Sequence, residues 1–235
     1  MLPIAILAGG LATRLHPLTV TIPKAMVEIC GEPFVHWQTK LLAKSGIREI
    51  VYCVAYKSEM IEDFLGDGSR YGVNIRYSHD GPTQLGTGGA VIKVLPHLGE
   101  KFMVLYGDSY LPIDYAKVAE TFLEAKKPAL MTVYQNDNNL DTSNVLYIDG
   151  RIEIYSKGKN SSDLHHIDYG LSCFNASVFP PYARQTPVDL SVICAELSSR
   201  KLLAGFEVHD RFYEIGSFNG IRDFTEYIKG TKDDI

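Results

Sequence analysis

Three uninterrupted apolar runs constrain the fold of this chain more than any other feature of its sequence. They occupy residues 3–8, 50–55 and 102–106, and none alternates apolar with polar residues as a strand with one solvated face does. Short continuous runs of this kind are typical of strands that are buried on both faces of a parallel sheet. We therefore expect these segments to form the centre of such a sheet.

Helical segments separate the apolar runs. Residues 33–44 place Phe34, Trp37 and Leu41 at helical spacing. Because strand and helix alternate through about the first 125 residues, the sequence predicts an α/β protein: a doubly wound, Rossmann-like α/β/α sandwich with a mostly parallel mixed sheet. Its ligand crevice should lie at the carboxyl ends of the strands. Further strands are expected at 73–77, 129–134, 145–148, 151–155, 171–174 and 206–209, and further helices at 58–65, 87–98, 190–199 and 221–229.

Composition excludes several classes of function. The net charge of −5 argues against the basic surface that binds nucleic acid. No apolar run reaches the ~18–20 residues of a membrane helix, and no signal peptide is visible, so we expect a cytoplasmic protein that does not enter a membrane. The cysteines form no CxxC pair and are expected to be buried thiols in a reducing compartment; they are Cys30, Cys53, Cys173 and Cys194.

The loop after the first apolar run carries residues suited to phosphate. Gly9-Gly10 ends the run, Arg14 follows, and Lys24 stands behind a proline ten residues later. Backbone N–H groups of a glycine loop can approach phosphate oxygens closely, and an arginine adds a charged planar fork. Taken singly, these residues are better explained as a tight turn and a surface lysine.

Together these residues form LAGGxxTRLxPLT, xPKAM and GEPF between Ile4 and Phe34, which closely resembles the N-terminal signature of sugar-1-phosphate nucleotidyltransferases. The resemblance implies transfer of a nucleoside monophosphate from an NTP to a sugar 1-phosphate, with Mg²⁺ or another divalent cation such as Mn²⁺ as cofactor. It implies that Arg14 grips the triphosphate and that Lys24 bridges the α-phosphate and the sugar phosphate. The residues implied to border the nucleotide are Leu7, Ala8, Gly9 and Gly10.

One residue departs from that signature. The family usually has glycine where this chain has Ala12. If the backbone there needs a positive φ, alanine costs on the order of 1 kcal/mol.

A second motif, DGPTQLGTGGA at residues 80–90, resembles the family's base-reading segment. Either Asp80 or Gly81 takes the place of the base reader, depending on which flank is counted, and we favour Asp80. A carboxylate accepts two adjacent hydrogen bonds, which suits N1–H and N2–H₂ of guanine, so GTP is favoured over UTP. Gly86 should let the base lie flat on the backbone, and Thr87 is expected to line the same site. An Asx-type turn at Asp80 is the alternative.

Acidic residues for a cation follow from the same resemblance. Asp108 ends the apolar run at 102–106, where a carboxylate lies in the crevice and can hold a hard cation. A turn-forming aspartate is the alternative interpretation. Late in the chain the family often has Asp-Ile-Gly, whereas this chain has Glu214-Ile215-Gly216. We predict that Asp108 and Glu214 bind the cation.

The sugar side of the site is expected in the second half of the chain. By resemblance, Lys157 matches a lysine that holds the sugar phosphate, although a solvated hairpin lysine is the alternative. Asp168 and Tyr169 replace the family's Asn-Ala before Gly170; Asp168 would bind sugar hydroxyls, and Tyr169 would narrow the pocket or stack on the sugar ring. We predict one domain over residues 1–235, with a nucleotide-binding half at 1–125 and a sugar-phosphate-binding half at 126–230.

The favoured activity is that of a guanylyltransferase acting on a mannose- or heptose-type 1-phosphate. A uridylyl- or cytidylyltransferase, acting on a sugar or a non-sugar phosphate, and a non-catalytic nucleotide-binding regulatory protein remain alternatives. A Rossmann dehydrogenase fits poorly, because no GxGxxG opens a helix. His165 and His166 are adjacent on an expected strand and should point to opposite faces, so a shared metal is not expected. A homodimer is the default oligomer.

Overall fold

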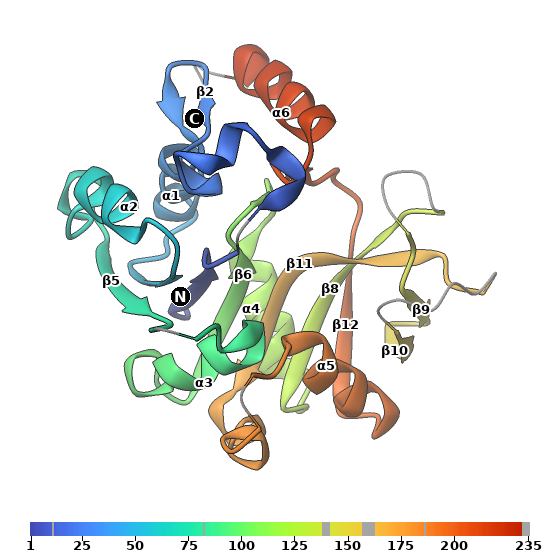
Figure 1. Cartoon of the computed structure of the whole chain (residues 1–235). Helices are drawn as coiled ribbons and strands as arrows, with labels where there is room; N and C mark the ends of the chain where they lie inside the picture. The colour runs from blue at the N-terminus through green and yellow to red at the C-terminus, as the bar shows by residue number, and fades with distance from the viewer. Residues whose placement is uncertain (11, 82, 138–141, 157–162, 186, 232–235) are drawn as a thin grey trace.

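A nine-stranded mixed sheet forms the centre of the protein (Figure 1). The computed structural model describes residues 1–10, 12–81, 83–137, 142–156, 163–185 and 187–231. From one edge to the other the strands are β5 (Asn74–His79), β4 (Glu49–Val54), β1 (Ile4–Leu7), β6 (Lys101–Tyr106), β11 (His166–Asn175), β8 (Ala129–Gln135), β12 (Leu203–Val208), β10 (Arg151–Tyr155) and β9 (Val145–Ile148).

The first four strands of the sheet are parallel. Strand β1 lies between β4 and β6, with Ile4 opposite both Ile50 and Met103, and β5 pairs with β4 at the edge. As expected for a strand covered on both faces, Ile4 and Ile6 pack into one hydrophobic cluster and Ala5 into the other.

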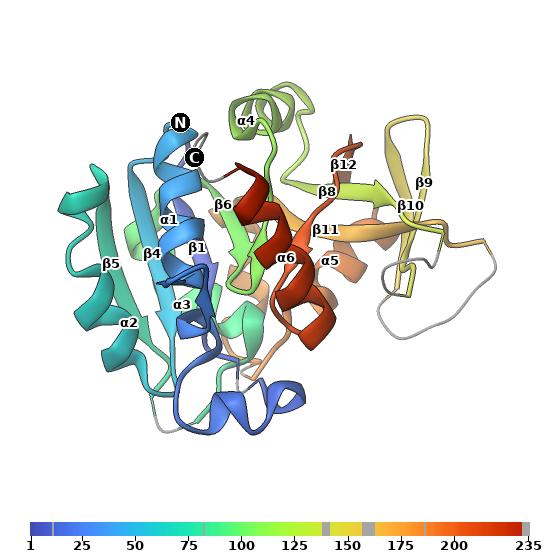
Figure 2. The same ribbon diagram turned by 90° about the horizontal axis from the view of Figure 1, so that it is seen from above.

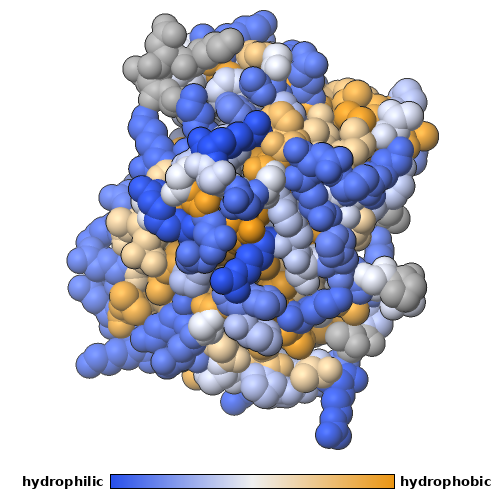
Figure 3. All heavy atoms as spheres, turned by 90° about the vertical axis from the view of Figure 1, so that its left-hand side faces the viewer, coloured by the Kyte–Doolittle hydropathy of each residue, from blue (hydrophilic) through white to orange (hydrophobic). Residues whose placement is uncertain are grey.

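The face turned toward the viewer in Figure 3 is mainly hydrophilic, with hydrophobic residues at several separate places.

The second half of the sheet is mostly antiparallel. Strand β11 runs antiparallel to both β6 and β8, whereas β12 is parallel to β8. Strands β9 and β10 form the predicted hairpin, in which Asp149 and Gly150 have φ of 48° and 78°. Positive φ at both residues is typical of a two-residue type I′ turn.

Helices cover both faces of the sheet (Figures 1 and 2). Helices α1 (Phe34–Lys44), α2 (Ser58–Leu65) and α4 (Tyr115–Glu124) pack on one face, and α3 (Gly86–Leu98) and α5 (Leu190–Ser199) pack on the other. Helix α6 (Phe218–Thr231) packs beside α1 and the small hairpin of β2 (Glu28–Ile29) and β3 (Glu32–Pro33). The doubly wound α/β architecture predicted from the sequence is therefore present. Within the described residues, no helix combines the length and the apolar character needed to cross a membrane.

Several elements differ from the sequence-based expectation, among them β12, which begins at Leu203 rather than at residue 206. Helix α4 was not predicted, although Asp114 caps it by accepting a hydrogen bond from Lys117 N–H at 3.0 Å. Strand β11 begins at His166 rather than at Leu171. Its first half places His166 and Asp168 among apolar residues, and its register with β8 shifts between Asp168 and Ser172. This half therefore has no continuous apolar run.

The four thiols are all unpaired. Cys53, Cys173 and Cys194 are buried as predicted, whereas Cys30 is only half-buried, and its Sγ donates to Thr225 O at 3.6 Å.

Candidate active site

Two cavities open at the carboxyl ends of the parallel strands. The first has a volume of about 270 Å³ and is lined by Leu7, Ala8, Gly9, Gly10, Lys24, Ala25, Cys53, Asp80, Gln84, Gly86, Thr87, Ala90, Tyr106, Gly107, Asp108 and Asp189. The second has a volume of about 560 Å³, and its wall includes Arg14, Tyr106, Asp108, Asp168, Tyr169, Gly170, Arg211, Tyr213, Glu214 and Ser217. Tyr106 and Asp108, at the end of β6, belong to both walls, so the two cavities meet there.

The loop after β1 approaches the end of β6 closely. Gly107 N–H donates to Leu7 O at 3.0 Å, and a Cβ added to Gly107 would lie 2.6 Å from that oxygen. A side chain at residue 107 would therefore push the two loops apart, which explains the glycine before Asp108. Ala12 in the first loop has φ of 50° and ψ of 41°, in the left-handed region. Alanine should therefore destabilise this backbone by on the order of 1 kcal/mol relative to the glycine that the family usually has there.

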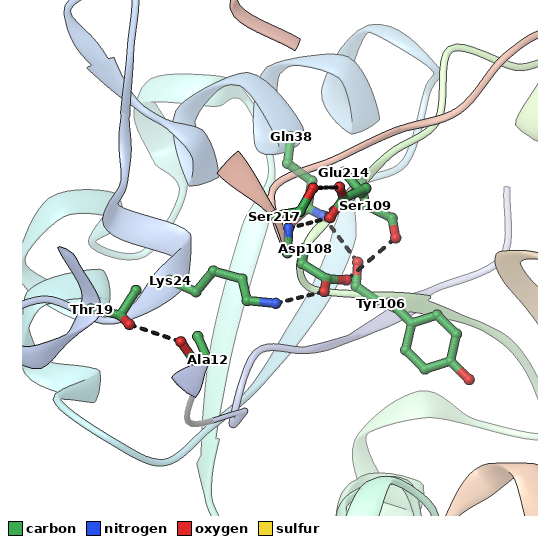
Figure 4. Close-up of polar contacts among 10 residues, drawn as sticks. Ala12, Thr19, Lys24, Gln38, Tyr106, Asp108, Ser109, Glu214 and Ser217 are labelled. Atoms are coloured by element: carbon green, nitrogen blue, oxygen red, sulfur yellow. Dashed lines mark hydrogen bonds and ion pairs between the residues drawn. The ribbon is translucent and has the colours of Figure 1, made fainter. Parts of the chain in front are cut away.

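Lys24 and Asp108 form an ion pair where the two cavities meet (Figure 4). Lys24 Nζ lies 2.7 Å from Asp108 Oδ2, and the two side chains are 17% and 32% exposed. Lys24 opens a short 3-10 helix behind Pro23, whose φ of −68° and ψ of 152° set the direction of the chain. This lysine is therefore fixed against a carboxylate and is not a free surface cation.

Glu214 reaches the same place through a two-stranded ladder. Strand β13 (Tyr213–Glu214) pairs with β7 (Ser109–Tyr110), which sets Glu214 opposite Ser109. Ile215 N–H also donates to Asp108 O at 3.0 Å. The Glu214 carboxylate accepts hydrogen bonds from Gly216 N–H and, at 2.6 Å, from Ser217 Oγ.

Arg14 completes the group of charged side chains. A Cβ built on Gly216 would lie 2.7 Å from Glu214 Oε2, 3.4 Å from Arg14 Nη2 and 3.5 Å from Asp108 Oδ2. These three side chains thus surround one point, and Lys24 is joined to this group by its ion pair with Asp108. The predicted contact of Arg14 with the triphosphate would place this residue on the first cavity. Arg14 instead lies on the wall of the second cavity, together with Asp108 and Glu214.

The two carboxylates fit a divalent cation that shares its coordination with phosphates. Mg²⁺ is commonly held by one or two carboxylates, with water and phosphate oxygens as its other ligands. Among the described residues there is no group of three or more His, Cys, Asp or Glu side chains that could hold a metal without such help. Asp108 and Glu214 therefore provide the acidic part of a site that a substrate phosphate would complete.

The adjacent histidines His165 and His166 have different acidic partners. His165 pairs with Asp137, and His166 pairs with Glu207.

Asp80 lies in the first cavity, at the end of β5. Its carboxylate accepts one long hydrogen bond, from Leu85 N–H at 3.5 Å, and burial raises the pKa of this carboxyl above its usual value. Of the two candidates for the base reader, the wall of the first cavity includes Asp80 but not Gly81, whose φ is 95°.

The segment before α5 supports the loop that carries Gly86 and Thr87. Val188 O accepts hydrogen bonds from the N–H groups of Gly88 and Gly89, at 2.9 and 3.1 Å. A Cβ on Gly86 would lie 2.5 Å from the same oxygen. Gly86 is therefore required for packing as well as for any contact with a base, and this second reason was not visible in the sequence.

The second cavity contains the residues predicted to bind the sugar, except that Lys157 lies outside the described residues. Asp168 Oδ1 accepts from Gly170 N–H at 3.0 Å, and the hydroxyl of Tyr155 hydrogen-bonds to the Asp168 carboxylate. Tyr169 is 2% exposed and packs edge-to-face on Phe212. Little of the Tyr169 ring is therefore free to stack on a sugar.

Gln38, which was not predicted from the sequence, holds the turn that carries Asp108 (Figure 4). This residue is 1% exposed, and its Nε2 donates to Tyr106 O at 3.3 Å and to Ser109 O at 2.8 Å. No sequence signal distinguishes it from the other polar residues of α1.

Replacing Gln38 with leucine should loosen that turn, because two carbonyl groups lose their donor. We expect kcat to fall by about tenfold, with destabilisation of about 1–3 kcal/mol. Steady-state kinetics and thermal unfolding measure both. Gln135→Leu, at an exposed glutamine of β8, is the control and should change neither by more than a small amount; an unchanged kcat in Gln38→Leu would exclude a positioning role.

Comparison with known proteins connects this site to one family. The profile of the family described as nucleotidyl transferase matches residues 4–145. An N-acetylmuramate alpha-1-phosphate uridylyltransferase of Neisseria meningitidis serogroup B is 42% identical over 117 residues, which are 49% of this chain and 51% of that protein. A D-glycero-alpha-D-manno-heptose 1-phosphate guanylyltransferase of Campylobacter jejuni is 31% identical over 212 residues, which are 90% of this chain and 93% of that protein. The solved inositol-1-phosphate CTP transferase of T. maritima has the same fold, with a TM-score of 0.83 at 20% identity over 100% of this chain and 98% of its own.

Proposed function

Because the chain belongs to the nucleotidyl transferase family, we propose that it transfers a nucleoside monophosphate from an NTP to a sugar 1-phosphate and releases pyrophosphate. The observation that carries this proposal is the convergence of Arg14, Lys24, Asp108 and Glu214 where the two cavities meet. One cavity would hold the NTP and the other the sugar phosphate. Two anions could then meet beside two cations and a pair of carboxylates.

The reaction needs no nucleophile from the protein. An oxygen of the sugar 1-phosphate attacks the α-phosphorus, the new P–O bond forms, and the bond to the bridging α–β oxygen breaks so that pyrophosphate leaves with the electron pair. The protein contributes positioning and neutralisation of charge. Lys24 stabilises charge on the α-phosphoryl group, Arg14 binds phosphate oxygens, and Lys157 would hold the acceptor phosphate. A divalent cation held by Asp108 and Glu214 would neutralise charge on the phosphates.

For the base we propose guanine, because Asp80 offers a half-buried carboxylate to the first cavity. Guanine presents two adjacent donors, N1–H and N2–H₂, which a carboxylate accepts together. Uracil has one donor, so UTP is the alternative substrate. The two relatives differ in this respect, since one is named for uridylyl transfer and the other for guanylyl transfer.

For the acceptor we propose a mannose- or heptose-type 1-phosphate. Asp168, held by Tyr155 and Gly170 N–H, would accept hydrogen bonds from sugar hydroxyls. We further propose that the protein acts in the cytoplasm and folds as one domain whose two halves share the central sheet. We also propose that it is a homodimer, which light scattering in solution tests.

Pyrophosphate release tests the reaction and its substrates together. The purified protein is incubated with Mg²⁺, one of GTP, UTP, CTP or ATP, and a panel of sugar and non-sugar 1-phosphates. We expect release with GTP and a mannose- or heptose-type acceptor. Thermal shift with each NTP separates binding from turnover: stabilisation by an NTP without pyrophosphate from any acceptor would indicate a regulatory nucleotide-binding protein instead.

A further inference from the structure

The first cavity contains an amide that hydrogen-bonds to none of the residues that the structure describes. Gln84 lines this cavity, and its side chain is exposed and makes no hydrogen bond to any residue in the described ranges. It lies in the segment that connects β5 to α3, four residues after Asp80. The same wall therefore carries a carboxylate and, close in sequence, an amide that is free to donate.

The Asp80 carboxylate is short of donors. Its Oδ2 accepts one hydrogen bond at 3.5 Å and lies inside the cavity, 3.7 Å from the position that a Cβ on Gly9 would take. Lys93 lies close enough to act on its charge, but Lys93 Nζ donates to His79 O. A partly desolvated carboxylate is stabilised by a ligand that supplies N–H groups.

We infer that Gln84 determines base specificity together with Asp80: the Gln84 amide donates to O6 of guanine while the Asp80 carboxylate accepts N1–H and N2–H₂. This inference rests on the proposed nucleotidyl transfer, and it assigns the base. The Watson–Crick edge of guanine presents one acceptor, O6, followed by two donors, N1–H and N2–H₂. The wall of the first cavity supplies the complementary groups, an amide donor from Gln84 and two carboxylate oxygens from Asp80.

Other bases do not match this arrangement. Uracil and thymine would place O2, an acceptor, against the second carboxylate oxygen, which leaves two lone pairs facing each other. Cytosine and adenine carry a ring-nitrogen acceptor beside their amino group, so the carboxylate would again face a lone pair. An unmatched buried polar group costs more than a missing contact, and discrimination should therefore favour guanine.

Inosine triphosphate separates the two contacts, because ITP keeps O6 and N1–H and lacks the 2-amino group. We expect Gln84→Leu to lower kcat/KM for GTP and for ITP by the same factor, about tenfold. Gln84→Glu, which turns a donor into an acceptor, should lower both further. Asp80→Asn should lower kcat/KM for GTP on the order of 10²-fold and for ITP by less, because only GTP brings the 2-amino group to that carboxylate.

Gln185→Leu, at an exposed glutamine outside the cavity, is the matched control and should leave both substrates unchanged. Binding of a non-hydrolysable GTP analogue, measured by calorimetry, should follow the same order and gives a readout independent of turnover. Equal use of GTP by Gln84→Leu and the parent protein, or a loss for GTP but not for ITP, would overturn the role of Gln84 and leave the transferase proposal standing. A parent protein that prefers UTP overturns the inference and the choice of base, and one that releases no pyrophosphate overturns the proposed reaction itself.

Discussion

Replacing Lys24 with alanine should lower kcat by about 10²-fold or more, as loss of other groups that stabilise charge in a transition state does. Lys24 Nζ lies 2.7 Å from Asp108 Oδ2, where the two cavities meet, so its positive charge is next to the proposed site of transfer. The fold should survive, because the Asp108 side chain is 32% exposed and water can hydrate it in the variant. Single-turnover kinetics and thermal unfolding measure the two effects separately.

The same variant should bind a divalent cation more tightly in the absence of NTP. In the present structure the Lys24 ammonium group contacts the carboxylate oxygen that a cation would use, so the two compete for Asp108. Titration of Mn²⁺ followed by electron paramagnetic resonance detects the change. Lys229→Ala, at an exposed lysine of α6, should alter neither kcat nor cation affinity. A Lys24→Ala variant with normal turnover would remove this lysine from the mechanism.

The centre of the sheet could be predicted because its strands are recognisable locally. Strand β1 packs Ile4 on one side and Ala5 on the other, and a segment buried on both faces must be apolar throughout. Strand β11 could be predicted only in its second half. Its first residues include His166 and Asp168, which pair with Glu207 and with Tyr155; such partners, distant in sequence, permit polar residues that no local pattern marks as a strand.

The site shows the same division between local and tertiary causes. Gly9, Arg14, Lys24 and Asp108 belong to short motifs that are visible in the sequence alone. Gln38 acts through two backbone carbonyls 68 and 71 residues away, a relation that exists only in the folded chain. Gln84 likewise shares a cavity wall with Asp80 only in the folded chain.

Replacing Gly216 with alanine should abolish most of the activity by filling the space between Asp108, Glu214 and Arg14. The added Cβ would lie 2.7 Å from Glu214 Oε2 and within 3.5 Å of the other two side chains. Gly216 does not have a positive φ, so alanine is compatible with its backbone. The contacts involve the ends of flexible side chains, which can move aside. We therefore expect a folded protein whose carboxylates are displaced from each other.

The effect of Gly216→Ala should appear first in the affinity for the cation. Mn²⁺ binding should weaken by about tenfold or more, and kcat/KM should fall on the order of 10²-fold, as with other losses of transition-state charge stabilisation. Gly230→Ala is the matched control, because no described residue lies within 4 Å of its added Cβ and alanine is favoured in a helix by up to about 1 kcal/mol. That control should keep its activity and unfold at the same or a higher temperature. If Gly216→Ala binds Mn²⁺ as the parent protein does, the cation does not lie between Asp108 and Glu214, and the acidic site must be placed elsewhere in the second cavity.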